Sequence, residues 1–423
     1  MSKARETKTE EQKVSRTVEE IVAETNIADV YRASKQLDGV ARKTSLIESE
    51  YFSELSANTV LIKPENLQKT GSFKLRGAYN CISQLSEEQK KKGIITASAG
   101  NHAQGVAYAA RELGVHAVIC MPATTPILKV EATRSYGVEV VLHGDTFDDA
   151  AAKAQELKDE HGYVYIHPFN DLEVLLGQGT TAMEIIDDCK DVDCILVPIG
   201  GGGFASGVAL AAKSLNPNIL VFGVEPEGAP CMNESFKANG VISLDAVDTV
   251  ADGCAVKTPG NLTYAFCKKY LDGIITVSEM EIMSALLSLI EKHKLIAEGA
   301  GVLSLAALTK LPFKGKKVAA IVSGGNIDIS TIAALIDKAL IARGREFCFS
   351  VPLPDKPGQL LAVANILAKL NANVIHLEHN QAMVTDSFKK VMLEVTVETN
   401  GPMHINSIVE ALEAEGYDVT KVY

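Results

Sequence analysis

The segment KPENLQKTGSFKLRG, residues 63–77, decides how the rest of this chain is interpreted. It follows the apolar run TVLI at 59–62, which predicts a strand, and a turn then precedes a predicted helix with Thr70 or Ser72 as its N-cap. Lys74 would lie in the first turn of this helix, where unpaired N–H groups and the helix dipole disfavour an ammonium and lower its pKa. Schiff-base chemistry needs such a neutral amine. A surface lysine near a helix start is an equally good interpretation of this segment alone.

Two further glycine-containing segments change that balance. SAGNHAQG at 98–105 and GGGG at 200–203 each follow an apolar run, and the second precedes an alanine-rich helix. Taken with residues 63–77, these motifs resemble the serine/threonine dehydratase family, whose members have the fold-type II pyridoxal-phosphate fold. The resemblance runs from about residue 18 to the C-terminus and is closest to single-chain threonine dehydratases with a C-terminal regulatory domain. It implies an α/β catalytic domain with two open parallel sheets, like the β subunit of tryptophan synthase.

The composition is ordinary for a soluble globular enzyme. The 423 residues are 47% hydrophobic and 22% charged, which allows two or three domains with sizeable cores. The net charge of −12 disfavours nucleic acid as a partner, and no apolar run approaches the roughly 20 residues of a membrane span. Residues 1–17 are too polar for a secretory signal and predict a frayed tail. The eight cysteines form no CxxC pair, so we expect reduced core thiols and a cytoplasmic location.

Strands and helices alternate along residues 18–343, which predicts parallel sheets with helices on both faces. The resemblance assigns this range to one catalytic domain, with a smaller, mobile subdomain inserted at about 66–168. The expected strands beyond the lysine segment are 117–122, 138–142, 194–199, 220–225, 274–277 and 318–322. The expected helices are 126–136, 146–161, 180–189, 205–215, 279–293, 300–309 and 331–343.

The last part of the chain, residues 344–423, has a different order of elements. Its pattern predicts strand, helix, strand, strand, helix and strand, which is a ferredoxin-like unit. With DKPGQL at the first strand–helix turn, it resembles an ACT domain, a family that binds small effectors at this turn and at the interface with a partner domain. Pro357 and Gly358 would then contact the effector, expected to be isoleucine, valine or a nucleotide, because glycine lets the backbone approach a ligand. An efficient turn without a ligand is the alternative.

Pyridoxal phosphate, the cofactor that the resemblance implies, needs several attachments. The resemblance gives Lys74 the Schiff base and, later, removal of the substrate α-proton, with Phe73 beside it. The phosphate would bind the backbone N–H groups of a glycine loop at a helix N-terminus. The residues of this loop are Gly200, Gly201, Gly202 and Gly203.

A dinucleotide-binding loop is the alternative for the same glycines. Gly200, Gly202 and Ala205 fit the pattern G-x-G-x-x-G/A, and Glu225 ends the next predicted strand as a ribose ligand would. No motif supplies a partner for hydride transfer, so the lysine segment favours the phosphate of pyridoxal phosphate.

The remaining contacts to cofactor and substrate come from two strand ends. The resemblance places the hydroxyl of Ser323 on the pyridine nitrogen, which favours loss of a β-leaving group over transamination; a helix cap is the alternative. It places Asn101 at the ring hydroxyl. The loop around Asn101 suits the substrate carboxylate, because it precedes a helix N-terminus. Its residues are Ser98, Ala99, Gly100, Asn101 and His102, and the histidine is expected to hold position rather than to transfer protons.

Two positions distinguish this chain from the serine racemases of the family. Ala99 stands where they have a serine that protonates the opposite face of the α-carbon, which predicts elimination with little racemisation. Glu225 and Ala229 resemble their cation site, but Cys231 replaces a carboxylate, so a divalent ion is disfavoured and a monovalent ion stays open. Glu298 is expected near the site, without a defined role.

The resemblance therefore implies pyridoxal-phosphate-dependent elimination of water from L-threonine, giving 2-oxobutanoate and ammonia, and from L-serine, giving pyruvate. A small effector would control the rate. A racemase or a β-replacement enzyme of the same fold is one alternative, and an amino-acid sensor with a vestigial core is another. Paired ACT domains imply a homodimer or homotetramer, and both isoleucine biosynthesis and threonine catabolism stay open as roles.

Overall fold

The computed structural model describes residues 16–380 and 390–423, so most of the predicted tail at 1–17 lies outside the described residues. The chain divides into two compact units. Unit 1 comprises the residues up to 282 together with 292–326, and unit 2 comprises 283–291 together with 327–423. Within the described ranges, no helix is both long and apolar enough to cross a bilayer.

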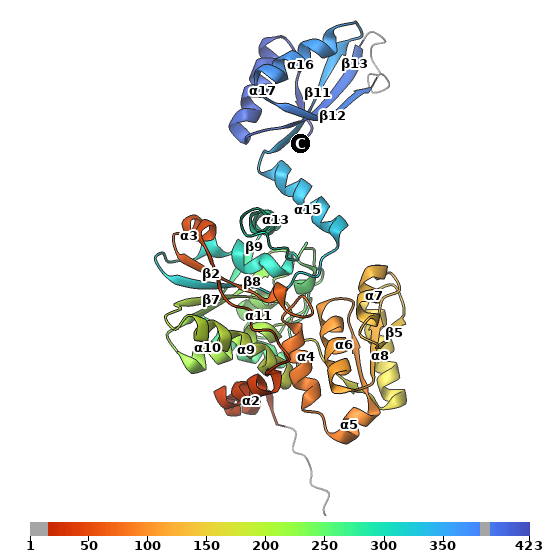
Figure 1. Cartoon of the computed structure of the whole chain (residues 1–423), viewed down its shortest axis with the longest axis vertical. Coiled ribbons are helices and arrows are strands. Elements are labelled where there is room, and N and C mark those ends of the chain that lie inside the picture. Colours follow the sequence, from red (N-terminus) through yellow and green to blue (C-terminus); the bar gives the residue numbers. More distant parts are fainter. Residues whose placement is uncertain (1–15, 381–389) are drawn as a thin grey trace, which may run out of the picture. The chain divides into compact units, whose positions relative to one another are not determined.

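The larger sheet of unit 1 has six strands. In spatial order they are β1 (Ile47–Ser49), β2 (Thr59–Pro64), β10 (Lys317–Val322), β7 (Cys194–Pro198), β8 (Leu220–Pro226) and β9 (Gly273–Val277). β1 is antiparallel to β2, and every other neighbouring pair is parallel. Parallel neighbours need crossover connections, which this chain supplies largely as helices (Figure 1).

The smaller sheet of unit 1 is entirely parallel. Its order is β5 (Glu139–Leu142), β4 (Ala117–Met121), β3 (Ile94–Ala97) and β6 (Val164–Tyr165). One face packs against Ala150 and Ala154 of α8 (Phe147–His161), and the other packs against α4 (Lys74–Ser83) and α6 (Asn101–Leu113). The predicted α/β class with two parallel sheets is confirmed.

Helices cover both faces of the larger sheet because its side chains alternate. Ile195 and Val197 of β7 point into a core shared with α2 (Ile27–Leu37), α9 (Leu172–Asp188), α10 (Gly203–Leu215) and α12 (Asn261–Tyr270). The strand is also contacted by α14 (Leu303–Ala306), whose Ser304 hydroxyl donates a 3.0 Å hydrogen bond to the carbonyl of Leu196. β7 is consequently buried along its whole length.

The other helices of the two units are short. They are α1 (Val18–Glu24), α3 (Glu50–Ser56), α5 (Glu87–Lys92), α7 (Ile127–Arg134), α11 (Cys231–Ala238) and α13 (Glu279–Ser288). The 3₁₀ segments are η1 (Glu65–Leu67), η2 (Asp252–Cys254), η4 (Ala300–Val302) and η5 (Leu308–Lys310), and η3 (Leu289–His293) is a π-helix.

The structure corrects several predicted helix boundaries. α4 begins at Lys74 with Phe73 as its N-cap and no side-chain cap, so the prediction of Thr70 or Ser72 as the cap is wrong. Ser72 instead pairs with Gly324 through a backbone bridge. The helix predicted at 180–189 begins eight residues earlier, at Leu172, and the Asp171 side chain caps it by accepting the N–H of Val174. The single helices predicted at 300–309 and 279–293 are interrupted by the 3₁₀ and π segments.

Unit 2 contains the predicted strand–helix–strand–strand–helix–strand order. The strands form an antiparallel sheet in the order β12 (Asn373–Asn380), β13 (Lys390–Glu398), β11 (Glu346–Pro354) and β14 (Thr420–Lys421). Helices α16 (Gln359–Lys369) and α17 (Pro402–Ala414) pack on one face of it, while α15 (Ile329–Ala342) precedes the first strand. This arrangement is a ferredoxin-like fold.

Glycines hold α4, α9 and α10 of unit 1 close together. A Cβ on Gly177 of α9 would lie 2.4 Å from the backbone oxygen of Arg76 in α4, and a Cβ on Gly207 of α10 would lie 2.0 Å from that of Leu175 in α9. Only glycine permits these approaches of one backbone to another. Since α4 begins with Lys74 and α10 follows the tetraglycine, the contacts fix the spacing of two predicted site segments.

The substitution Gly207→Ala is expected to lower the free energy of unfolding by about 1–3 kcal/mol, because the added methyl group overpacks the contact between α9 and α10. Urea denaturation at pH 7 measures this change. Gly240→Ala is the matched control, since a Cβ there meets no heavy atom within 4 Å. Equal urea midpoints for the two variants would mean that α9 and α10 can move apart to admit the methyl group without a loss of stability.

Candidate active site

The predicted site segments follow the carboxyl ends of parallel strands in unit 1. Lys74 lies beyond β2 at the start of α4, the tetraglycine follows β7 and ends at the first residue of α10, and Ser323 directly follows β10. The loop at 98–100 lies between β3 and α6 of the smaller sheet. Parallel α/β folds bind their ligands at this edge.

Lys74 is held as an amine that loses its proton easily. Its Nζ donates a 2.7 Å hydrogen bond to the carbonyl oxygen of Pro168, and it forms no ion pair with a carboxylate of the described residues. Burial lowers the pKa of Lys74 to about 8, although the acidic groups of Cys254 and Glu298 oppose this shift. Near neutral pH, a usable fraction of the amine is therefore uncharged and nucleophilic.

The tetraglycine is a backbone cradle with no room for side chains. A Cβ on Gly201 would lie 2.3 Å from the ring of Phe169, and one on Gly202, which has φ of 92°, would lie 2.9 Å from the side chain of Thr263. The Thr263 hydroxyl also donates a 2.6 Å hydrogen bond to the Gly201 carbonyl and so fixes the loop. The N-terminus of α10 follows directly, which suits a phosphate group.

Ser323 and Phe73 connect the lysine segment to the end of the neighbouring strand, β10. The Phe73 N–H donates a 3.1 Å hydrogen bond to the Ser323 carbonyl, and the Phe73 ring stacks on Phe204, with 3.8 Å between the ring centroids. The Ser323 side chain is buried, and among the described residues its hydroxyl makes only a long, 3.4 Å contact with the Ala300 carbonyl. This hydroxyl can therefore donate to a ring nitrogen. The amine, the cradle and the hydroxyl together fit pyridoxal phosphate.

Asn101 lies at the centre of a chain of polar contacts. Its Oδ1 accepts a 2.7 Å hydrogen bond from Asn326 Nδ2, and its Nδ2 donates a 2.6 Å hydrogen bond to Glu298 Oε1. The preceding residues, Ser98, Ala99 and Gly100, are partly exposed. A Cβ on Gly100 would meet no heavy atom within 4 Å, so the loop borders open space that a small carboxylate could enter.

His102 is buried and neutral. Its Nε2 lies 3.0 Å from the Ile166 carbonyl, which can only accept, so Nε2 carries the hydrogen. Burial and the nearby charge of Lys74 lower the pKa of His102 to about 3. These features favour the predicted positional role over proton transfer.

The sequence interpretation missed the turn that faces Lys74. His167 Nδ1 accepts the N–H groups of Phe169, at 3.2 Å, and of Asn170, at 2.9 Å, and this turn presents the Pro168 carbonyl to the lysine. Burial and Lys74 lower the pKa of His167 to about 4, so it stays a neutral acceptor. No local pattern in the sequence marks this turn.

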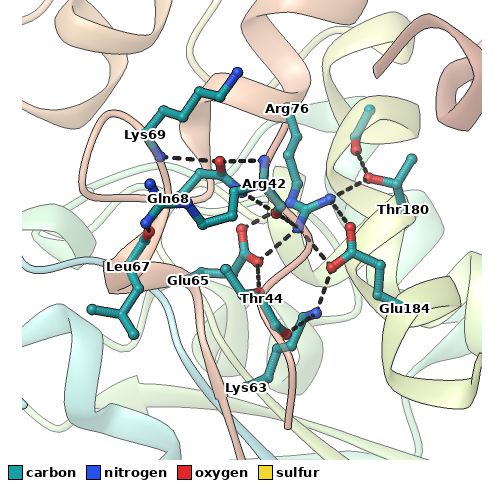
Figure 2. A network of polar contacts seen from close by, with 11 residues as sticks. Arg42, Thr44, Lys63, Glu65, Leu67, Gln68, Lys69, Arg76, Thr180 and Glu184 are labelled. Carbon is teal, nitrogen blue, oxygen red and sulfur yellow. Dashed lines mark hydrogen bonds and ion pairs between the residues drawn. The ribbon is translucent and has the colours of Figure 1, made fainter. Parts of the chain in front are cut away.

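A second missed feature is the buried quartet of Lys63, Glu65, Arg76 and Glu184, shown in Figure 2. Arg76 forms ion pairs with Glu65 at 2.8 Å and with Glu184 at 2.6 Å, and Lys63 pairs with Glu184 at 2.5 Å. The quartet joins the end of β2, the helix α4 that carries Lys74, and α9. In the sequence, the quartet could have been suspected from Lys63 and Glu65, two charged residues that follow the apolar run at 59–62.

Glu225 is occupied by contacts with its own unit. Its two carboxylate oxygens accept the N–H groups of Met232 and Asn233, each at 2.8 Å, at the start of α11. Burial raises the pKa of Glu225 to about 7. Among the described residues, no group of three or more His, Cys, Asp or Glu side chains could hold a metal ion.

Comparisons with known proteins agree with this site. Residues 37–324 match a family model described as pyridoxal-phosphate dependent enzyme. The L-threonine ammonia-lyase of Thermotoga maritima is 45% identical over 396 residues, which cover 93% of this chain and 98% of the relative. The processed threonine deaminase isoform 2 of Solanum lycopersicum has a TM-score of 0.72 at 40% identity and covers 74% of this chain and 87% of its own. Maize serine racemase has a TM-score of 0.71 at 34% identity, with 75% and 98% covered.

Proposed function

Because this chain belongs to the family of pyridoxal-phosphate dependent enzymes, we propose that it is an L-threonine ammonia-lyase that converts L-threonine to 2-oxobutanoate and ammonia. The observation that carries this proposal is the Lys74 amine, which burial keeps easily deprotonated at the same sheet edge as the tetraglycine. The substrate itself is taken from the relatives, which are named for threonine and match nearly the whole chain.

In this proposal each group of site residues has a separate role. Pyridoxal phosphate, when bound, withdraws electrons and makes the α-proton of an attached amino acid acidic. Lys74 would hold the cofactor and would later accept the α-proton, while the N–H groups of residues 200–203 would hold the phosphate. Ser323 would offer an uncharged hydrogen bond to the ring nitrogen, which would moderate the electron withdrawal. Residues 98–101 would receive the substrate carboxylate at the N-terminus of α6.

L-Serine is a proposed second substrate, since it carries the same β-hydroxyl and lacks only a methyl group. Pyruvate would be its product. Ala99 has no hydroxyl with which to protonate an α-carbon, which favours elimination over racemisation. We also propose a reducing, cytoplasmic environment, because all eight cysteines are free thiols.

Effector control through unit 2 is a further part of the proposal. Gly358, in the DKPGQL turn, has φ of 92° and precedes α16, and a Cβ there would meet no heavy atom within 4 Å. Its backbone is therefore open to a small ligand such as isoleucine, valine or a nucleotide. Pro357 lies exposed beside it. ACT-like units often act in pairs, so a homodimer or homotetramer is proposed.

The proposal is tested by the initial rate of 2-oxobutanoate formation from L-threonine, with and without L-isoleucine. A sigmoidal rate curve that isoleucine suppresses is expected if unit 2 senses the amino acid. An unaffected rate would point to another effector, such as a nucleotide. Release of D-amino acid without oxo acid would favour the racemase alternative, and the absence of both products would contradict the proposed activity.

A further inference from the structure

Glu298 lies between two segments of the proposed cofactor site. Its Oε1 accepts the 2.6 Å hydrogen bond from Asn101 Nδ2, and its backbone N–H donates a 3.1 Å bond to the Gly324 carbonyl. A Cβ on Gly324 would lie 2.5 Å from Oε1, so the carboxylate is pressed against the turn that follows Ser323. The side chain nevertheless keeps partial solvent access. Glu298 therefore contacts the loop at 98–101 through Asn101 and lies close enough to Lys74 to act on it electrostatically.

The neighbouring amides fix which atom faces Glu298. Asn326 Nδ2 donates to the carbonyl of Thr70 at 2.8 Å, so this atom is a nitrogen, and its second bond goes to Asn101 Oδ1. The Asn101 amide must then direct its Nδ2 group toward Glu298. One N–H of that group is used by the carboxylate, and the other has no acceptor in the part of the chain that the structure describes. Glu298 thus orients the residue that the sequence assigns to the cofactor ring.

The charged groups around Glu298 come from several elements. Glu298 interacts electrostatically with Lys74 of α4, Lys129 of α7 and Asp252 of η2. It also interacts electrostatically with the Cys254 thiol. Burial raises the pKa of Glu298 to about 7, while the hydrogen bond from Asn101 opposes the shift. The carboxylate in turn raises the pKa of Lys74 against the effect of burial. Glu298 is therefore positioned to change charge near neutral pH and to alter the proton affinity of the lysine.

We propose that Glu298 is a positioning residue of this site, which orients the Asn101 amide and, when ionised, increases the affinity of the Lys74 amine for a proton. This inference rests on the proposed function in that Lys74 is the base. An ionised Glu298 makes Lys74 a better acceptor of the substrate α-proton. When Glu298 is neutral, the Lys74 amine is more often unprotonated but is a weaker base.

The variant Glu298→Gln separates charge from shape. Glutamine keeps an oxygen for Asn101 but cannot ionise. We expect uptake of pyridoxal phosphate by the cofactor-free protein, followed by its visible absorbance, to have a pH midpoint lower by about one unit than in the parent, because Lys74 loses an opposing negative charge. Turnover of L-threonine should fall at least tenfold, and the acidic limb of the kcat/KM profile near pH 7 should disappear. A damaged fold would instead impair uptake and turnover together.

Two further variants complete the test. Glu298→Asp keeps the charge and should restore the uptake midpoint to within a few tenths of a unit. Glu227→Gln, at an exposed carboxylate, is the matched control and should change neither quantity. Unchanged uptake midpoint and pH profile in Glu298→Gln would overturn the inference. If the parent binds the cofactor but forms no oxo acid from threonine, the proposed function fails, while the uptake midpoints still test Glu298.

Discussion

Replacement of Lys74 by alanine is expected to abolish 2-oxobutanoate formation, with kcat lower by more than about 10³-fold. A positioned general base alone contributes about 10²–10⁴-fold. Lys74 would also provide the covalent link to the cofactor, and among the described residues no other lysine lies at the start of α4 beside the tetraglycine. The visible absorption of the lysine-bound cofactor should disappear in the same variant.

The fold should tolerate this change. Lys74 has a lowered pKa, and among the described residues the hydrogen-bond partner of its Nζ is a backbone carbonyl. Alanine therefore removes a buried amine without leaving an ion-pair partner behind. Lys69→Ala is the matched control, since this exposed lysine lies in the segment just before α4. It should keep both the absorption band and most of the activity. A visible band retained in Lys74→Ala would show that another residue binds the cofactor.

The positions of the site segments could be predicted because each motif follows an apolar strand. The family resemblance assigns Lys74, the tetraglycine and Ser323 to one cofactor site, and the structure places all three after the carboxyl ends of strands of the larger sheet. The ferredoxin-like order of unit 2 was predicted for a similar reason, since alternating and helical periods are local properties of the sequence.

The contacts that orient the site could not be predicted in the same way. The carbonyl that accepts from Lys74 belongs to Pro168, and the acceptor of Asn101 Nδ2 is Glu298, 197 positions away in the chain. Such pairs depend on how elements pack, and no local pattern encodes them. Ser72 shows the opposite error, because a favourable N-cap residue is used in a backbone bridge to Gly324 instead.

The buried quartet gives the largest expected effect on stability. Arg76→Met should lower the free energy of unfolding by about 3–5 kcal/mol at pH 7, because Glu65 and Glu184 would both lose the ion pair with Arg76 and Lys63 pairs directly only with Glu184 among the described residues. Glu65 is fully buried, so water cannot replace its lost partner, whereas Glu184 is partly exposed. Urea denaturation measures the change, and Arg111→Met, at an exposed ion pair with Glu112, is the matched control.

The pH dependence of this difference identifies the cause. Burial disfavours ionisation of Glu65, but Arg76 outweighs it and holds the pKa of Glu65 below its ordinary value. The parent therefore loses this stabilisation as the pH falls below about 4.3, where the unfolded carboxylate gains its proton. Without Arg76, burial would raise the pKa of Glu65 instead, and protonation of Glu65 would remove the cost of its unpaired charge as the pH falls. The difference in the free energy of unfolding between the parent and Arg76→Met should accordingly become smaller in acid.

The double variant Arg76→Met with Glu65→Gln should recover part of the lost free energy of unfolding at pH 7. A difference between the parent and Arg76→Met that stays constant between pH 7 and pH 4 would mean that lost packing of the arginine side chain, rather than an unpaired carboxylate, weakens the fold.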